Sequence, residues 1–278
     1  MSVPLALTPL ATPRTYKLTT TSVVRLNEAE ERNTYTTVAR QTLLERKPNN
    51  TYRLALEVLH FEAENPTFFN ALAADLNQVS NSLIIQTDIY GRLDRIENKA
   101  ELLQTWRRLK PTVVEKYRQY YPPAFFEAFE QNLRTEGVFE KTLRHKGLHG
   151  VLLAGLYGYG YVPEVPVVGT RVIEQFFNNI DLPLKTSLEP VADSPSGTLT
   201  LHLTGALHQA ALRQDDLRRL LRSMAGNPLL KVSMQANCQE RYELATATGA
   251  LVRAEQQLQA EIPGIYRNEL HHQLETIA

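Results

Sequence analysis

The segment Thr198 to Leu207 places the strongest constraint on the fold of this chain. Leu199, Leu201 and Leu203 alternate there with threonine and histidine side chains. Successive side chains of a strand point to opposite faces, so this alternation predicts a half-buried β-strand. The fold must therefore include a sheet with one apolar face and one polar face.

Three further alternating runs occupy residues 15–26, 35–43 and 52–59, with polar turns at 27–33 and 47–50. Short polar turns between such runs predict an antiparallel meander. Asn65 and Pro66 then have the residue types of a helix start, with Asn65 as the N-cap. Strands at 83–88 and 93–96, joined by a turn at Tyr90-Gly91, complete a predicted N-terminal part, residues 1–98.

The middle of the chain, residues 99–145, is predicted to be helical. An apolar stripe at helical spacing runs from Lys99 to Tyr121 and includes Trp106. Pro111 falls within the stripe and predicts a kink or a break, because proline cannot donate the helical hydrogen bond. A second stripe includes Phe129. We expect Trp106 and Phe129 to be buried.

The remainder, residues 146–278, is predicted to be rich in strands. A loop-rich crossover spans 145–170, strand and turn follow at 165–180, and strands are expected at 230–238 and 251–258. Asp215-Asp216 predicts a helix start, with Gly226 beyond its end. The fold class predicted is α+β, with one or more curved antiparallel sheets, helices covering one face and a helical middle. The three parts are expected to form one continuous domain, 15–278.

Composition excludes several classes of protein. The 278 residues carry 30 basic and 30 acidic side chains, which argues against a nucleic-acid partner. One cysteine rules out a disulfide framework and a cysteine-based zinc site. The longest apolar window, 148–162, is shorter than the roughly 20 residues of a membrane helix, so no membrane span is expected. A cytoplasmic location is predicted, with a mature exported form as the alternative, because no basic leader is visible at Met1.

No catalytic motif is present in the sequence, and we predict no catalytic residues and no cofactor. His145 and His149 have the spacing of a zinc pair on a helix, but no third ligand is visible, so no metal site is predicted. Cys238 alternates with apolar residues and is expected to be a buried, inert thiol. His271 and His272 are expected at the surface or at a helix end.

A glycine–tyrosine segment is the predicted binding site. Tyr157, Tyr159 and Tyr161 alternate with Gly158 and Gly160. In an extended chain the three rings share one face, and tyrosine offers contact area at low entropic cost. We expect these five residues to lie at a contact surface. The alternative is that the rings simply close the core.

Two hairpin-like segments carry a resemblance to a known family. Residues Ser82 to Asn98 and Tyr242 to Glu255 each read as strand, glycine turn and returning strand. Their order after a strand meander resembles the curved antiparallel sheets of the bacterial lipoprotein-carrier (LolA-like) superfamily. The resemblance implies a sheet that grips an apolar ligand beneath covering helices, and it carries over no functional residue. An internal duplication is an alternative source of the two hairpins.

The predicted function is binding without catalysis: a bacterial accessory, adaptor or immunity-type protein that docks a protein partner. A carrier with an apolar pocket for a lipid-like ligand is the first alternative, and an enzyme of an unrecognised family is the second. A carrier predicts an apolar cavity larger than about 300 Å³. A docking protein predicts an exposed apolar patch instead.

Overall fold

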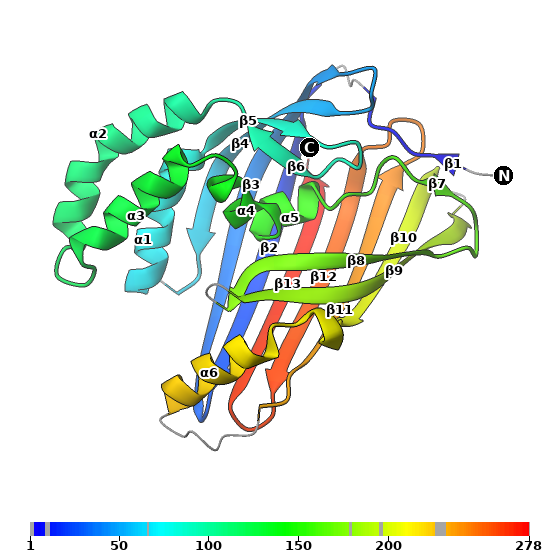
Figure 1. Ribbon diagram of the computed structural model, residues 1–278. Coiled ribbons are helices and arrows are strands. Elements are labelled where there is room, and N and C mark those ends of the chain that lie inside the picture. The colour runs from blue at the N-terminus through cyan, green and yellow to red at the C-terminus, as the bar shows by residue number, and fades with distance from the viewer. Residues whose placement is uncertain are drawn as a thin grey trace.

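The chain forms one antiparallel sheet of eleven strands (Figure 1), in the order β6-β5-β4-β3-β2-β13-β12-β11-β10-β9-β8. The computed structural model describes residues 3–8, 12–65, 67–177, 180–194, 197–225 and 232–277. The strands are β2 (Arg14–Leu26), β3 (Ala29–Arg46), β4 (Tyr52–Ala63), β5 (Ser82–Thr87), β6 (Leu93–Ile96), β8 (Val167–Phe177), β9 (Ile180–Ser194), β10 (Thr198–Leu207), β11 (Gln235–Ala245), β12 (Leu251–Ile262) and β13 (Tyr266–Ile277). A separate short pair joins β1 (Val3–Pro4) to β7 (Gly160–Tyr161).

Strands from the two ends of the sequence meet in the middle of the sheet. β13 pairs with β2 from Tyr266 opposite Leu26 to Ile277 opposite Thr15. The predicted N-terminal and C-terminal parts therefore contribute to the same sheet. The predicted antiparallel α+β fold is confirmed.

Helices lie against one face of the sheet. They are α1 (Phe68–Asn77), α2 (Lys99–Tyr117), α3 (Pro123–Arg134), α4 (Val138–Arg144), α5 (Gly147–Leu152) and α6 (Gln214–Ala225). Figure 1 shows α4 and α5 in front of the sheet, with β8 and β9 crossing in front of β13, β12 and β11. The sheet curves so strongly that its β8 edge covers the same face as the helices. No helix in the described ranges has the length and apolar character needed to cross a bilayer.

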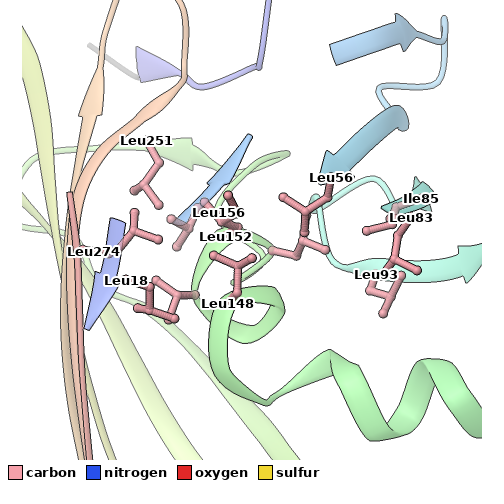
Figure 2. Packing of buried hydrophobic residues seen from close by; sticks show 14 of the residues in the cluster. Leu18, Leu56, Leu83, Ile85, Leu93, Leu148, Leu152, Leu156, Leu251 and Leu274 are labelled. Atoms are coloured by element: carbon pink, nitrogen blue, oxygen red, sulfur yellow. The ribbon is translucent and has the colours of Figure 1, made fainter. Parts of the chain in front are cut away.

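The core lies between the concave face of the sheet and the α5 segment. Leu148, Leu152 and Leu156 point from this segment into the core, as Figure 2 shows. Leu18 of β2 and Leu274 of β13 lie on one side of them. The core leucines on the other side come from β4, β5 and β6 and are Leu56, Leu83 and Leu93. Burial of these side chains is the main force that holds the curved sheet around α5.

Two predicted helix features differ from the structure. The N-cap of α1 is Thr67, not Asn65: the Thr67 hydroxyl accepts a hydrogen bond from the Asn70 backbone N–H at 3.2 Å. Pro66 lies outside the described residues. Pro111 does not break α2, which continues from Lys99 to Tyr117. Pro111 and Arg107, whose carbonyl loses its usual partner, both lie on the exposed side, where water can replace the missing bond.

Several strand boundaries also differ from the prediction. The polar residues 27–33 mostly belong to β3, and the turn itself is only Asn27-Glu28. The predicted strand at 230–238 begins as β11 at Gln235, while residues 226–231, including Gly226, lie outside the described part. β9 and β13 were not predicted. His272 is therefore in the centre of the sheet and is 4% exposed, so its predicted surface position is wrong.

Candidate functional site

The glycine–tyrosine segment joins two turns of the sheet. The Tyr157 backbone N–H donates to the Tyr90 carbonyl at 3.0 Å, in the turn between β5 and β6. The Tyr157 hydroxyl donates to the Gly249 carbonyl at 3.0 Å, in the turn between β11 and β12. Burial raises the pKa of Tyr157. This ring therefore holds together the two hairpins on which the family resemblance rests.

The three tyrosine rings do not form one exposed face. Tyr161 is 1% exposed, and its hydroxyl donates to the Leu156 carbonyl at 2.8 Å. Tyr159 is partly buried and stacks on Tyr90 with ring centroids 5.0 Å apart. Only Gly158 and Gly160 are exposed in this run. The three rings are therefore not exposed together, because Tyr161 is buried and the other two are partly buried; the binding role of these five residues stays a prediction.

The two histidines with zinc-like spacing do not share a helix. His145 follows α4 as its C-cap, and Lys146 is extended, with φ −118° and ψ 135°, before α5 begins at Gly147. Burial, with help from Arg171, lowers the pKa of His145 to about 3. The described ranges contain no group of three or more histidine, cysteine, aspartate or glutamate side chains that could hold a metal ion.

An apolar cavity of about 540 Å³ lies between the concave face of the sheet and the helices. Its floor comes from β2, β3 and β4, and its roof comes from α1, α3, α4 and α5. Apolar side chains make most of the wall: Leu18, Val58, Phe61, Ala73, Leu76, Phe129, Phe139, Leu143 and Leu148. Phe129, which we expected to be buried, is only partly so, because one side of its ring faces this cavity.

Several polar groups in the cavity wall are engaged within the protein, whereas the side chains of Thr37 and Asn77 make no hydrogen bond among the described residues. The Tyr35 hydroxyl donates to Asn70 Oδ1 at 2.9 Å, and the Thr142 hydroxyl donates to the Val138 carbonyl at 3.0 Å. The Thr20 hydroxyl is 2.8 Å from His272 Nδ1. Each of these three groups already has a hydrogen-bond partner within the protein.

His149 and Lys146 are the two basic residues of the described cavity wall. His149 Nε2 is buried and has no hydrogen-bond partner among the described residues. Burial lowers the pKa of His149 to about 4, so the imidazole is neutral at pH 7. Lys146 is exposed at the edge of the cavity, and desolvation lowers its pKa. Its side chain makes no hydrogen bond or ion pair within the described part of the chain.

A polar network lies on the other side of α5, beneath β8. Arg171 of β8 pairs with Glu240 of β11, which also accepts a hydrogen bond from the Tyr242 hydroxyl. Gln256 Nε2 donates to the Tyr242 hydroxyl at 2.8 Å. Cys238 is 3% exposed beside this network, and burial raises its pKa to about 12, which leaves the thiol protonated and unreactive. The network connects the edge strand β8 to β11 and β12.

The sequence did not reveal the cavity. Its wall combines residues from three strands, from α1, α3, α4 and α5, from the 3-10 turn after α1 and from the segment before α5, and no local motif marks such a set. The apolar window at 148–162 was a partial signal, since Leu148 and His149 belong to it. The length of that window predicts only that it does not span a membrane.

Comparison with known proteins does not assign this chain to a family. No protein family matches the chain, and no curated protein matches it. One solved structure, described as "lipid-protein interactions in lipovitellin", is similar with a TM-score of 0.42 and 8% sequence identity. The similarity covers 98% of this chain but only 25% of the lipovitellin chain, so this chain spans about a quarter of that length.

Proposed function

We propose that this protein binds without catalysis and holds an apolar, lipid-like ligand in the cavity between β2–β4 and the helices. The observation that carries the proposal is the cavity itself, whose volume of about 540 Å³ lies within the range of small-molecule sites. This volume is larger than the minimum of about 300 Å³ expected for the cavity of a carrier.

The chemistry of the wall favours an apolar occupant. Phe61, Phe129 and Phe139 face the cavity, and the hydroxyls of Tyr35 and Thr142 are paired within the protein. Water in such a space finds few partners, whereas each methylene group transferred from water to an apolar site contributes about 0.8 kcal/mol. An aliphatic ligand therefore gains affinity with every carbon that it places between sheet and helices.

The test uses an uncharged apolar probe, N-phenyl-1-naphthylamine, whose fluorescence rises on leaving water. We expect saturable binding to the full chain and loss of binding in Ala73→Phe, because Ala73 lines the cavity and phenylalanine would fill it. Ala74→Phe is the matched control on the same helix, since Ala74 is not part of the wall. Equal binding by both variants, or no binding by the natural chain, would refute the proposal.

A protein partner remains the second candidate. β8 is an edge strand, and Val168 and Val172 on its outer face are 76% and 42% exposed. An unpaired edge with exposed valines can accept a strand from another protein. The test is affinity purification with Val168→Lys as the comparison. A partner that docks here is retained by the natural chain and lost from the variant, and a partner retained equally by both argues against this edge.

A further inference from the structure

The two basic residues of the described cavity wall lie three positions apart on one segment. Lys146 precedes α5 and His149 lies within it, and both belong to the cavity wall. No aspartate or glutamate is present in the described part of that wall. The described cavity wall thus combines apolar side chains with one lysine and one histidine.

An unpaired buried nitrogen costs free energy in the folded protein. A buried polar atom without a partner typically loses about 1–3 kcal/mol relative to one that is paired. His149 Nε2 is in this situation, although nearly all buried polar groups in proteins find partners. A neutral imidazole can donate from one ring nitrogen, so an oxygen atom placed beside Nε2 would satisfy it.

Lys146 adds a charge to the same end. A partly desolvated ammonium with no ion pair gains from an anion at hydrogen-bond distance, and charge-assisted hydrogen bonds are roughly twice as strong as neutral ones. Desolvation lowers the pKa of Lys146, and no described acidic group offsets this effect. An anionic ligand would supply the missing counter-charge.

We infer that the ligand is a fatty acid: an aliphatic carboxylate whose chain lies among Phe61, Phe129 and Phe139 and whose carboxylate is bound by Lys146 and His149. This inference rests on the proposed function, because it assigns the polar end of the same cavity. Lys146 Nζ donates to one carboxylate oxygen. His149 Nε2 is covered by protein atoms in the chain without ligand, so the ligand must displace a side chain before its other oxygen accepts from Nε2–H.

The first experiment compares two ligands with the same chain. Isothermal titration calorimetry at pH 7 measures binding of dodecanoate and of dodecan-1-ol to the full chain. We expect dodecanoate to bind at least about tenfold more tightly, the ratio typical of one hydrogen bond to a charged group. Equal affinities would leave cavity binding intact but overturn the fatty-acid inference. Binding of neither ligand would overturn both proposals.

Variants then assign the headgroup contacts. Lys146→Met keeps an unbranched apolar side chain and removes the charge, and it should weaken dodecanoate binding about tenfold without affecting dodecan-1-ol. Lys17→Met is the matched control, since Lys17 is exposed on the opposite face of β2 from Leu18. If Lys17→Met weakens binding as much as Lys146→Met does, the effect is general charge attraction and the inference fails.

His149→Leu separates a binding role from a structural one. Because Nε2 makes no hydrogen bond within the described protein, leucine should leave the urea midpoint of unfolding unchanged or raise it. Dodecanoate binding should weaken about threefold or more, while dodecan-1-ol binding is kept. A lowered urea midpoint together with unchanged dodecanoate binding would show that His149 serves the fold, and would overturn its assignment to the ligand.

Discussion

Removing one member of the buried ion pair between Arg171 and Glu240 should destabilise this fold far more than removing one member of an exposed pair. Arg171 and Glu240 side chains are 18% and 6% exposed, and Glu240 is also bonded to Tyr242. Arg171→Met removes the cation and leaves a carboxylate in the interior. Removing one member of a buried pair typically costs about 3–5 kcal/mol, and we expect a loss of that size in the free energy of unfolding.

The magnitude depends on burial, so an exposed pair provides the control. Arg40 of β3 and Glu57 of β4 also pair across strands, but their side chains are 46% and 45% exposed. Exposed pairs contribute about 0–1 kcal/mol, so Arg40→Met should have little effect. Urea unfolding followed by far-ultraviolet circular dichroism at pH 7 gives the free energy of unfolding for each variant.

A double variant tests the physical reason. Arg171→Met combined with Glu240→Leu leaves no unpaired charge, and replacing a buried pair by apolar residues is often neutral or stabilising. The double variant should therefore be more stable than Arg171→Met alone. The reasoning is wrong if Arg171→Met costs no more than Arg40→Met, or if the second substitution only adds to the loss.

Three other outcomes are expected. Trp106 is 0% exposed, and its ring centroid lies 4.8 Å from that of Phe129. Trp106→Ala should therefore lower the free energy of unfolding by about 3–5 kcal/mol and the melting temperature by several degrees. An unchanged melting curve would contradict this packing. Burial lowers the pKa of His272 from 6.5 to about 4, so the unfolded chain binds a proton that the folded chain refuses between these values, and this residue should contribute roughly 3 kcal/mol to the fall in the free energy of unfolding as the pH drops from 6.5 to 4. Burial also lowers the pKa of His145 and His149, so His272→Gln should reduce the pH dependence without abolishing it, and an unchanged pH dependence would contradict the assignment. Incubation with EDTA should leave the melting temperature unaltered, whereas a fall that zinc restores would indicate a metal site at His145 and His149.

The strands with regular alternation were predictable from the sequence alone. Thr198 to Leu207 is β10 with the predicted bounds, and Leu199, Leu201 and Leu203 are buried while His202 is exposed. The hairpin of β5 and β6 also falls where it was predicted. In these segments local pattern and tertiary burial agree, because one face meets the core and the other meets water.

β9 was missed because of its prolines. Pro183 and Pro190 argue against a strand inside a sheet, since proline cannot donate a ladder hydrogen bond. The structure accommodates both by placing each where only one neighbouring strand is paired. Pro183 is opposite Val172 of β8, and Pro190 is opposite Leu201 of β10. The offset between the neighbours of β9 creates these positions, and the sequence does not encode that offset locally.

β13 was missed because a histidine occupies a buried position of the strand. Leu270, His272 and Leu274 share one face, and His272 interrupts the expected apolar alternation. Its partner is Thr20, opposite it on β2, with 2.8 Å between the hydroxyl and Nδ1. The pairing that makes a buried histidine acceptable lies about 250 residues away in the sequence, and the same kind of distance separates the residues of the cavity wall.

The position of β13 beside β2 has a consequence for synthesis of the protein on the ribosome. Until residues 266–277 have left the ribosomal tunnel, β2 keeps one edge without a partner. That edge is thirteen residues long and belongs to a strand that is finally central. Exposed edges of this kind readily pair with other nascent chains. The newly made chain therefore remains open to aggregation until β13 has emerged from the ribosome, and a chaperone that shields β2 during this interval would raise the yield of folded protein.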